Sequence, residues 1–333
     1  MCVVMKIAKA TRWFVAGTVI AAMLAGAASF RADAQSELMR GDRMPYDRFD
    51  RMPKTDIDIA GSTIHLAVAA GDIDLPQEKI IDWIRMSAKA VVIYYGRFPV
   101  KSLRLLLVPV EGARIRGGTT WGYRGAAIRI PFGRESTEEV LKRDWVMVHE
   151  MVHTALPDLD QRYGWLSEGL AVYIEPIARV QAGDLTARAI WQDMMRDMPK
   201  GLPERGDQGL DNTDTWGRRY WGGAMFCLLA DIEIRKRTNN RLGLQDAMRG
   251  VLAAGGNHEE DWSLDRVLST ADKAVGVDVL TKLHNEMGPK PVTPDLAALW
   301  RDLGLKSQGD SVEFDDTAPL AAIRKAITEP RAG

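Results

Sequence analysis

Cysteine is nearly absent from this chain of 333 residues, which holds only Cys2 and Cys227. Cys227 lies in an apolar run of helical character and is expected to be a core residue. A single cysteine beyond the N-terminal region cannot form an intrachain disulfide, so the fold must be stable without one. Structural zinc modules favour four protein ligands and cysteine, so the same scarcity argues against that class of site.

An excess of charge of one sign is also lacking, because 44 Lys and Arg stand against 45 Asp and Glu. The formal net charge is -1 at pH 7. Removing residues 1–34 would take away four basic residues and one acidic residue, a net three positive charges, and would change -1 to -4. A mildly acidic chain argues against nucleic acid as a partner.

Long apolar runs are limited to the N-terminus. An uncharged, alanine-rich stretch extends from Trp13 to Phe30, follows three basic residues, and leads to the A-x-A pattern at 32–34. These features predict a signal peptide over residues 1–34, cleaved before Gln35, and a periplasmic or secreted protein. The stretch is short for a permanent span. We therefore expect no stable membrane span after cleavage, with an uncleaved anchor as the alternative.

Histidine is scarce too, yet two of the five histidines stand four apart in His149-Glu150-Met151-Val152-His153. Residues four apart lie on one face of an α-helix. His149 and His153 can therefore direct two imidazole nitrogens at one ion, while Glu150 points about 100° away around the axis. This H-E-x-x-H pattern is typical of hydrolytic zinc sites. The remaining histidines are expected to be ordinary surface or core residues: His65, His258 and His284.

A zinc site of this kind needs a third protein ligand. Glu168 is the preferred candidate, because the run from Trp165 to Tyr173 is otherwise apolar apart from Ser167, and no Lys or Arg stands three or four residues from Glu168. An uncompensated carboxylate in apolar surroundings is costly, and a bound cation would neutralise it. Two alternatives stay open, namely a salt bridge from Glu168 to a distant arginine and ligation by Asp160 instead.

The order of these segments resembles the gluzincin metallopeptidases, in their peptidase MA-like and aminopeptidase N-like branches. The resemblance rests on H-E-M-V-H at 149–153, W-L-S-E-G-L-A-V-Y at 165–173 and Y-W-G-G-A at 220–224. It implies one Zn²⁺ per chain, held by His149, His153 and Glu168. It also implies that Glu150 is the general base and that Tyr220 donates a hydrogen bond to the oxyanion of the transition state.

Two features depart from that family. Fourteen residues separate His153 from Glu168, fewer than is usual in aminopeptidase N, which predicts a shorter loop between the two helices. The G-A-M-E-N segment that binds the free α-amine of substrates there has no counterpart, so exopeptidase specificity does not follow. The Gly-rich segment 117–122 precedes a predicted strand. The resemblance implies that this segment borders the cleft and pairs with extended substrate, and an ordinary hairpin turn is the alternative.

Periodicity predicts the elements before the zinc site. Residues 35–54 have the composition of a flexible linker. A β-hairpin is expected over 56–68, a helix from Pro76 to about Tyr95, and strands at 102–108 and 126–130. Ser136 is expected to cap one continuous zinc-site helix that ends before Pro157. The side chains expected to face inward from that helix are Leu141, Trp145, Val148 and Val152.

The sequence as a whole predicts an α+β, zincin-like fold. Residues 55–156 would form a subdomain with a small mixed sheet and the active-site helix. Residues 157–333 would form a mainly helical subdomain that supplies the third ligand. Its predicted helices are 165–180, 185–196, 219–237, 243–254, 264–270, 277–287 and 294–302, followed by a strand at 312–314 and a helix at 318–327.

The predicted function is zinc-dependent hydrolysis of peptide bonds in a peptide or protein substrate outside the cytoplasm. The alternative is a catalytically silent zincin fold that binds peptides or cell-envelope partners. The sequence does not indicate an oligomeric state.

Overall fold

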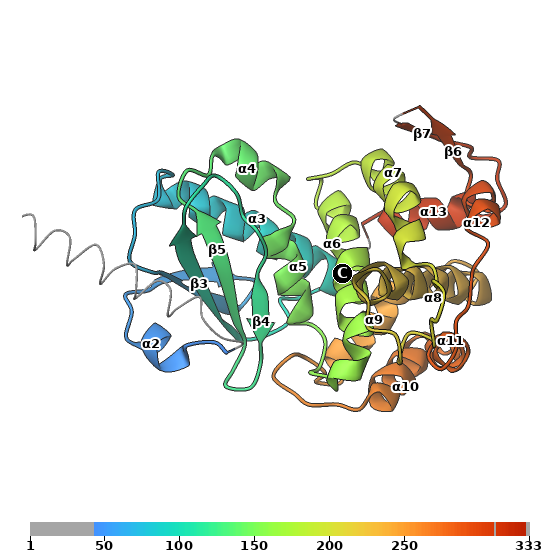
Figure 1. Ribbon diagram of the computed structural model, residues 1–333, viewed down its shortest axis with the longest axis horizontal. Coiled ribbons are helices and arrows are strands. Elements are labelled where there is room, and N and C mark those ends of the chain that lie inside the picture. Colours follow the sequence, from blue (N-terminus) through green and yellow to red (C-terminus); the bar gives the residue numbers. More distant parts are fainter. Residues whose placement is uncertain (1–42, 310, 331–333) are drawn as a thin grey trace, which may run out of the picture.

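The computed structural model describes residues 43–309 and 311–330, in which a sheet half and a helical half lie side by side (Figure 1). The predicted signal peptide and its cleavage site lie outside the described residues. Within the described part of the chain, no helix is both long and apolar enough to cross a membrane.

The sheet half contains five strands in the order β1-β2-β3-β5-β4. β1 and β2 form the predicted antiparallel hairpin, β2, β3 and β5 are parallel, and β4 pairs antiparallel with β5 at the edge. The sheet is therefore small and mixed, as predicted. The strands are Thr55–Ile59 (β1), Ser62–Val68 (β2), Ser102–Val110 (β3), Thr119–Trp121 (β4) and Ala127–Gly133 (β5).

β3 lies at the centre of the sheet, and its alternate side chains enter two different cores. Leu105 and Leu107 belong to the large core that includes the buried face of α3 (Gln77–Tyr95). Leu106 and Val108 belong to a smaller core on the opposite face. A strand buried on both faces has the continuous apolar sequence seen here.

The prediction of a flexible linker over residues 35–54 is wrong for its described part, residues 43–54. Residues 46–50 of that stretch form a short helix, α2 (Tyr46–Asp50). Tyr46 and Phe49 are only 2% and 1% exposed, and the Tyr46 hydroxyl donates to the Gly125 carbonyl at 2.7 Å. The linker prediction rested on the charged and proline residues of the stretch and missed two aromatic side chains, which cover one face of the sheet.

The predicted zinc-site helix is interrupted and forms α4 (Glu138–Arg143) and α5 (Val146–His153). Asp144 separates them with an extended backbone, φ -68° and ψ 134°. Its carboxylate accepts hydrogen bonds from the backbone amides of Val146 and Met147, at 3.2 and 3.0 Å. Asp144 thereby satisfies amide groups at the start of α5 that have no partner within the helix.

Two further details of this helix pair differ from the prediction. Thr137, not Ser136, caps α4 by accepting a hydrogen bond from the Val140 amide. The break at Asp144 also turns Trp145 outward, where it is 51% exposed. The other three side chains expected to face inward are buried, as predicted: Leu141, Val148 and Val152.

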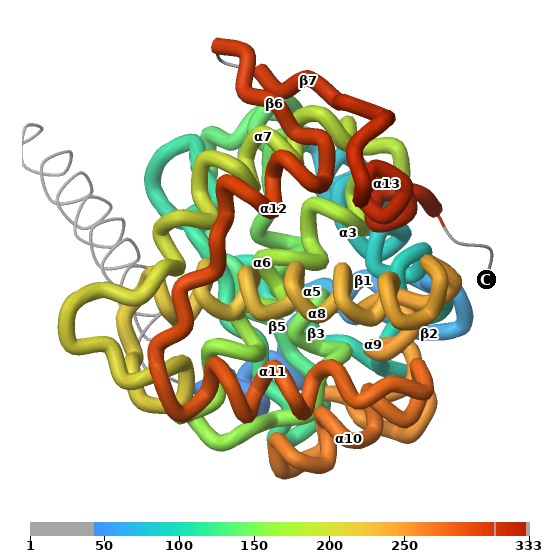
Figure 2. Tube along the Cα trace, turned by 90° about the vertical axis from the view of Figure 1, so that its right-hand side faces the viewer, coloured from blue at the N-terminus to red at the C-terminus, as the bar shows by residue number. Residues whose placement is uncertain are grey.

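The helical half is organised around α6 (Gly164–Gln181), which packs against α5 on one side and α8 (Gly223–Arg237) on another. Figure 2 shows α8 on the side turned away from the sheet, with α10 and α11 below it and α12 and α13 above it. The predicted helices are confirmed, with shifted ends. The remaining elements are η1 (Gln161–Tyr163), α7 (Ala187–Asp197), η2 (Met198–Gly201), η3 (Arg218–Gly222), α9 (Leu244–Ala253), α10 (Leu264–Val275), α11 (Val279–Met287), α12 (Leu296–Asp302), β6 (Leu305–Gln308), β7 (Ser311–Phe314) and α13 (Ala321–Thr328).

Candidate metal centre

His149 and His153 lie one turn apart on α5, with 4.8 Å between their ring centroids. Both side chains are buried. Nδ1 of His153 lies 3.0 Å from the Ser167 hydroxyl oxygen. A hydrogen bond at Nδ1 fixes the orientation of the ring and leaves Nε2 to face the centre of the site.

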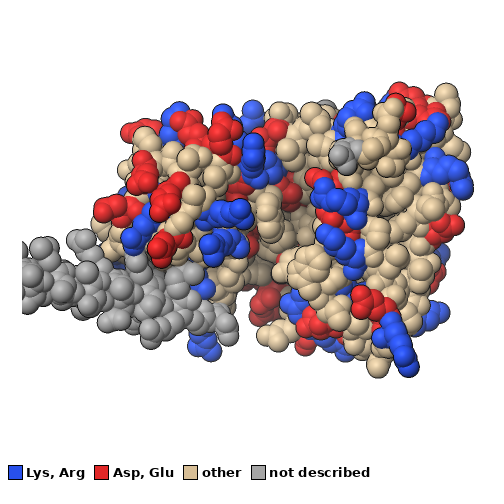
Figure 3. All heavy atoms as spheres, turned by 45° about the horizontal axis from the view of Figure 1, so that its top comes forward, with Lys and Arg blue, Asp and Glu red and all other residues tan. Residues whose placement is uncertain are grey.

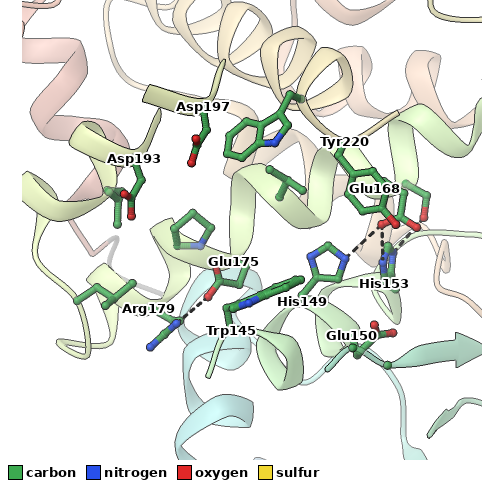
Figure 4. Close-up of a pocket in the computed structure, with 18 of the residues that line it drawn as sticks. Trp145, His149, Glu150, His153, Glu168, Glu175, Arg179, Asp193, Asp197 and Tyr220 are labelled. Atoms are coloured by element: carbon green, nitrogen blue, oxygen red, sulfur yellow. Dashed lines mark hydrogen bonds and ion pairs between the residues drawn. The ribbon is translucent and has the colours of Figure 1, made fainter. Parts of the chain in front are cut away.

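Glu168 extends from α6 toward both imidazoles (Figure 4). Its Oε2 lies 3.2 Å from Nε2 of His149 and 3.4 Å from Nε2 of His153. One ligand atom from each of the three residues lies within 4.8 Å of the others. The structure therefore brings together the three residues that the sequence nominated as ligands.

The geometry does not favour either alternative for the third ligand. Asp160 is exposed and caps η1 by accepting a hydrogen bond from the Arg162 amide at 3.0 Å. Arg219 lies close enough to Glu168 to interact electrostatically. Its guanidinium, however, is bound by Asp214 at 2.8 and 2.9 Å.

The electrostatics of the site suit a cation. Burial by itself would raise the pKa of Glu168, but hydrogen bonds from His149 and His153 outweigh burial and hold that pKa well below its usual range. Burial would lower the pKa of His153, yet the Glu168 carboxylate raises it. Two imidazole nitrogens and one carboxylate oxygen form the ligand set of catalytic zinc sites, which keep a fourth position open. The residues present therefore fit Zn²⁺.

Two glycines bring the Tyr220 segment against α6. η3, a π-helical turn that contains Tyr220, leads directly into α8. A Cβ at Gly223 would lie 1.9 Å from the Trp165 carbonyl oxygen, and a Cβ at Gly169 would lie 2.4 Å from the Gly223 Cα. The two helices can approach this closely beside Glu168 because neither glycine carries a side chain.

Tyr220 lines the same cleft as the three ligands and lies beside Glu168 (Figure 4). Its ring stacks on the exposed Trp216, with 5.9 Å between centroids. Burial raises the pKa of Tyr220, and the carboxylates of Glu168 and Glu150 raise it further. The hydroxyl therefore stays protonated at neutral pH and is available as a hydrogen-bond donor.

Glu150 is directed away from the ligands toward the edge strand. The Thr120 hydroxyl donates to Oε2 of Glu150 at 2.7 Å. Gly118 lies so close that a Cβ there would be 2.5 Å from Cγ of Glu150. The Gly-rich segment thus borders the cleft with residues 117–120 and contains the edge strand β4, which is the placement that the resemblance implied.

The site lies in a cleft of about 950 Å³ between the two halves. His258 lines the cleft near His153, and the segment that carries it packs against the end of β4, since a Cβ at Gly122 would lie 1.5 Å from the His258 carbonyl oxygen. From the metal ligands a longer arm of the cleft extends past Trp145 to α7, where Asp193 and Asp197 lie (Figure 4). Figure 4 shows Glu175 and Arg179 of α6 in this longer arm.

His258 is a residue of the cleft that sequence reasoning missed. It was expected to be an ordinary surface or core residue, but it lines the cleft, and its pKa is lowered by burial and by nearby His153. A tertiary contact places it there, because the His258 amide donates to the Thr154 carbonyl at 3.1 Å. The residues around His258 form no motif that could have shown this.

Comparison with solved structures finds matches in two named proteins. An aminopeptidase N family protein from Idiomarina loihiensis matches with a TM-score of 0.58 and 16% identity, over 78% of this chain and 50% of that chain. An M1 zinc metallopeptidase from Deinococcus radiodurans matches with a TM-score of 0.47 and 17% identity, over 72% of this chain and 51% of that chain. A scan against models of known families and a search of curated proteins each find no match.

The first of these matches establishes the class of fold. The chain has a gluzincin-like, α+β fold with a small mixed sheet, an active-site helix and a mainly helical C-terminal part. The chain spans about half the length of the solved proteins that it matches. In this chain the H-E-x-x-H motif lies on α5, at the junction of the two halves (Figure 1).

Proposed function

We propose that this protein is an exported zinc-dependent peptidase that hydrolyses peptide bonds with Glu150 as general base. The observation that carries the proposal is the convergence of His149, His153 and Glu168 within 4.8 Å. The same cleft contains the carboxylate of Glu150, which follows His149 in the sequence and is hydrogen-bonded to Thr120. The gluzincin-like fold supports it. A structural metal site would not require an open cleft or a separately oriented carboxylate.

The protein's own residues have distinct parts in the proposed reaction. Zn²⁺ held by His149, His153 and Glu168 would supply Lewis acidity toward water and the scissile carbonyl. Glu150 accepts the proton of the attacking water and passes it to the leaving amine. Tyr220 donates a hydrogen bond to the developing oxyanion.

Substrate binding uses the edge of the sheet. An extended peptide can hydrogen-bond to free backbone groups of an edge strand without a particular side-chain sequence. β4 is such a strand, and Thr119 and Thr120 line the cleft. The substrate is therefore expected to lie along β4 with its scissile bond beside Glu150.

The proposed location outside the cytoplasm is supported by the basic, apolar and A-x-A segments of residues 1–34. N-terminal sequencing of the protein from its native host should find a mature chain that begins at or near Gln35, in the periplasm or the medium. An intact N-terminus on soluble cytoplasmic protein would rule the export proposal out.

The peptidase activity is tested with purified protein, a peptide library and mass spectrometry of the products. We expect cleavage that stops when a chelator removes zinc and returns when zinc is restored. Glu150→Gln should bind zinc as the wild type does but cleave nothing. Peptides that bind to the wild type and remain intact would identify the alternative, a catalytically silent zincin fold.

A further inference from the structure

The longer arm of the cleft contains several charged side chains, most of which neutralise one another. Arg179 pairs with Glu175 and Asp184 at 2.9 and 2.6 Å. On α7 and the turn after it, two acids and two bases pair among themselves at 2.6 to 2.7 Å: Asp193, Arg196, Asp197 and Lys200. This wall and the floor of the arm therefore leave no cation in excess.

The opposite wall is different. Arg116, Lys142 and Arg143 line it. Lys142 pairs with Glu139 at 3.0 Å, with both side chains mostly exposed, and Arg143 lies near enough to the same carboxylate to interact with it electrostatically without a direct ion pair. Arg116 and Arg143 form no ion pair with any residue in the ranges 43–309 and 311–330. Figure 3 shows Lys and Arg side chains along both sides of the groove between the two halves. One carboxylate, Glu139, cannot neutralise three cations, so an excess of positive charge remains on the wall formed by the sheet half.

The two unpaired arginines lie at the same end of the cleft. The segment 116–122 runs along the cleft. Gly122 is packed against His258, and Gly118, four residues earlier, contacts Glu150. Arg116 lies two residues before Gly118 and therefore further from His258. Arg143 precedes Trp145 at the start of α5, and the other end of α5 carries His153, near His258. Both arginines therefore lie at the end away from His258, where the arm continues toward α7.

An apolar surface connects these arginines to the metal ligands. Trp145 is 51% exposed on the cleft wall, and its ring meets the His149 ring edge-on with 5.2 Å between centroids. A substrate that crosses Trp145 from the scissile bond reaches Arg143 next. An apolar contact followed by unpaired guanidinium groups suits a peptide segment that carries a carboxylate, the group that arginine binds with charge-assisted and often bidentate hydrogen bonds.

We propose that the longer arm is an anion subsite, in which Arg116 and Arg143 bind a carboxylate of the substrate on one side of the scissile bond. The carboxylate is either an acidic side chain or a free C-terminus. The inference deepens the proposed peptidase function and rests on it for the position of the scissile bond. The binding groups themselves do not depend on hydrolysis.

Two sets of peptides distinguish the two sources of the carboxylate. In the first, zinc-loaded wild type cleaves C-terminally amidated peptides that differ only by Glu or Gln at successive positions. In the second, it cleaves one neutral peptide with a free or an amidated C-terminus. In one of the two peptide sets, we expect kcat/KM to be about five- to tenfold higher for the peptide that carries the carboxylate, as for a partly exposed charge-assisted contact. The preference should shrink at high salt.

The variant Arg116→Gln/Arg143→Gln should bring that ratio close to one, whereas Arg51→Gln, an exposed arginine on the far side of the sheet half, should leave it unchanged. Equal rates for the carboxylate peptide and its neutral counterpart in both peptide sets would overturn the proposal. A preference that survives the double substitution would overturn it as well. Both arginines are exposed, and thermal unfolding with zinc analysis confirms that the variants are folded and loaded.

Binding separates this proposal from the proposed function. Calorimetry with the zinc-loaded Glu150→Gln variant gives the affinity ratio of the same peptides in the absence of turnover. If the wild type cleaves no peptide, the peptidase proposal fails. A tighter affinity for carboxylate peptides that Arg116→Gln/Arg143→Gln removes would still establish the subsite, and equal affinities would still overturn it.

Discussion

The hydroxyl of Thr120 on the edge strand is hydrogen-bonded to the carboxylate of Glu150 on the metal-site helix, with 2.7 Å between the two oxygens. The same hydroxyl lies 3.0 Å from the Glu150 carbonyl oxygen. The strand expected to bind substrate and the residue expected to accept a proton are therefore fixed to each other. Because Gly118 closes over the other side of the carboxylate, Glu150 has little freedom to change its orientation.

Thr120→Val removes this hydrogen bond with almost no change of volume. We expect kcat to fall roughly tenfold or more, as for a lost hydrogen bond to a charged group, with little change in KM. Thr120→Ser keeps the hydroxyl and should retain most of the rate. Steady-state kinetics at equal zinc content makes the comparison, and a Thr120→Val enzyme with full kcat would show that Glu150 needs no such support.

Glu168 and Glu150 should respond differently to substitution, because only Glu168 faces the imidazoles. Glu168→Ala removes one of three ligands and should weaken zinc binding strongly. Glu150→Gln should abolish turnover and leave about one zinc per chain. Metal analysis after dialysis measures both. Equal zinc loss in the two variants, or zinc loss in neither, is incompatible with these roles.

Tyr220→Phe keeps the stack on Trp216 and removes only the hydroxyl. A donor that acts on the oxyanion stabilises mainly the transition state, so kcat should fall about 10²-fold or more while KM barely changes. A residue that only packs would give a nearly normal kcat. Retention of most of the rate with zinc bound would remove Tyr220 from the catalytic residues and leave the three ligands untouched.

Zinc binding should depend on pH in a direction set by His153. Its pKa is raised above the ordinary 6.5, so in metal-free protein its contribution to stability is complete below pH 6.5 and is lost as the pH rises through the folded-state pKa. Glu168 has a lowered pKa, so its contribution is present above the ordinary 4.5 and is lost as the pH falls through its folded-state value. Zinc requires a deprotonated imidazole, so a proton competes with it at His153.

The increase in melting temperature on adding zinc should therefore be larger near pH 8 than near pH 6. Thermal unfolding at a fixed free zinc concentration measures it. An equal increase at both pH values would show that the His153 proton does not compete with the metal.

Much of the fold and most of the site could be predicted because the signals are local. The spacing of His149 and His153 is a property of one helix turn, and the apolar run around Glu168 belongs to a single helix. The two-sided burial of β3 likewise appears as one continuous apolar sequence.

The features that were missed depend on contacts between distant segments. α2 becomes a helix because Tyr46 and Phe49 meet the sheet, and His258 reaches the cleft through a backbone contact with Thr154. The break at Asp144 is local, but its side chain could serve equally as an exposed helix residue. In the structure the Asp144 carboxylate caps the start of α5 instead, and Leu141 and Val148 on the two sides of the break are both buried in the core.

The shortness of β4 limits aggregation at this edge of the sheet. An edge strand offers unpaired backbone groups, and long, flat edges join sheets of neighbouring molecules into aggregates. β4 has three residues, with glycines on both sides and the His258 segment against Gly122. An edge of this length inside a cleft can receive a single extended peptide, but it is too short and too enclosed to pair with the sheet of another copy.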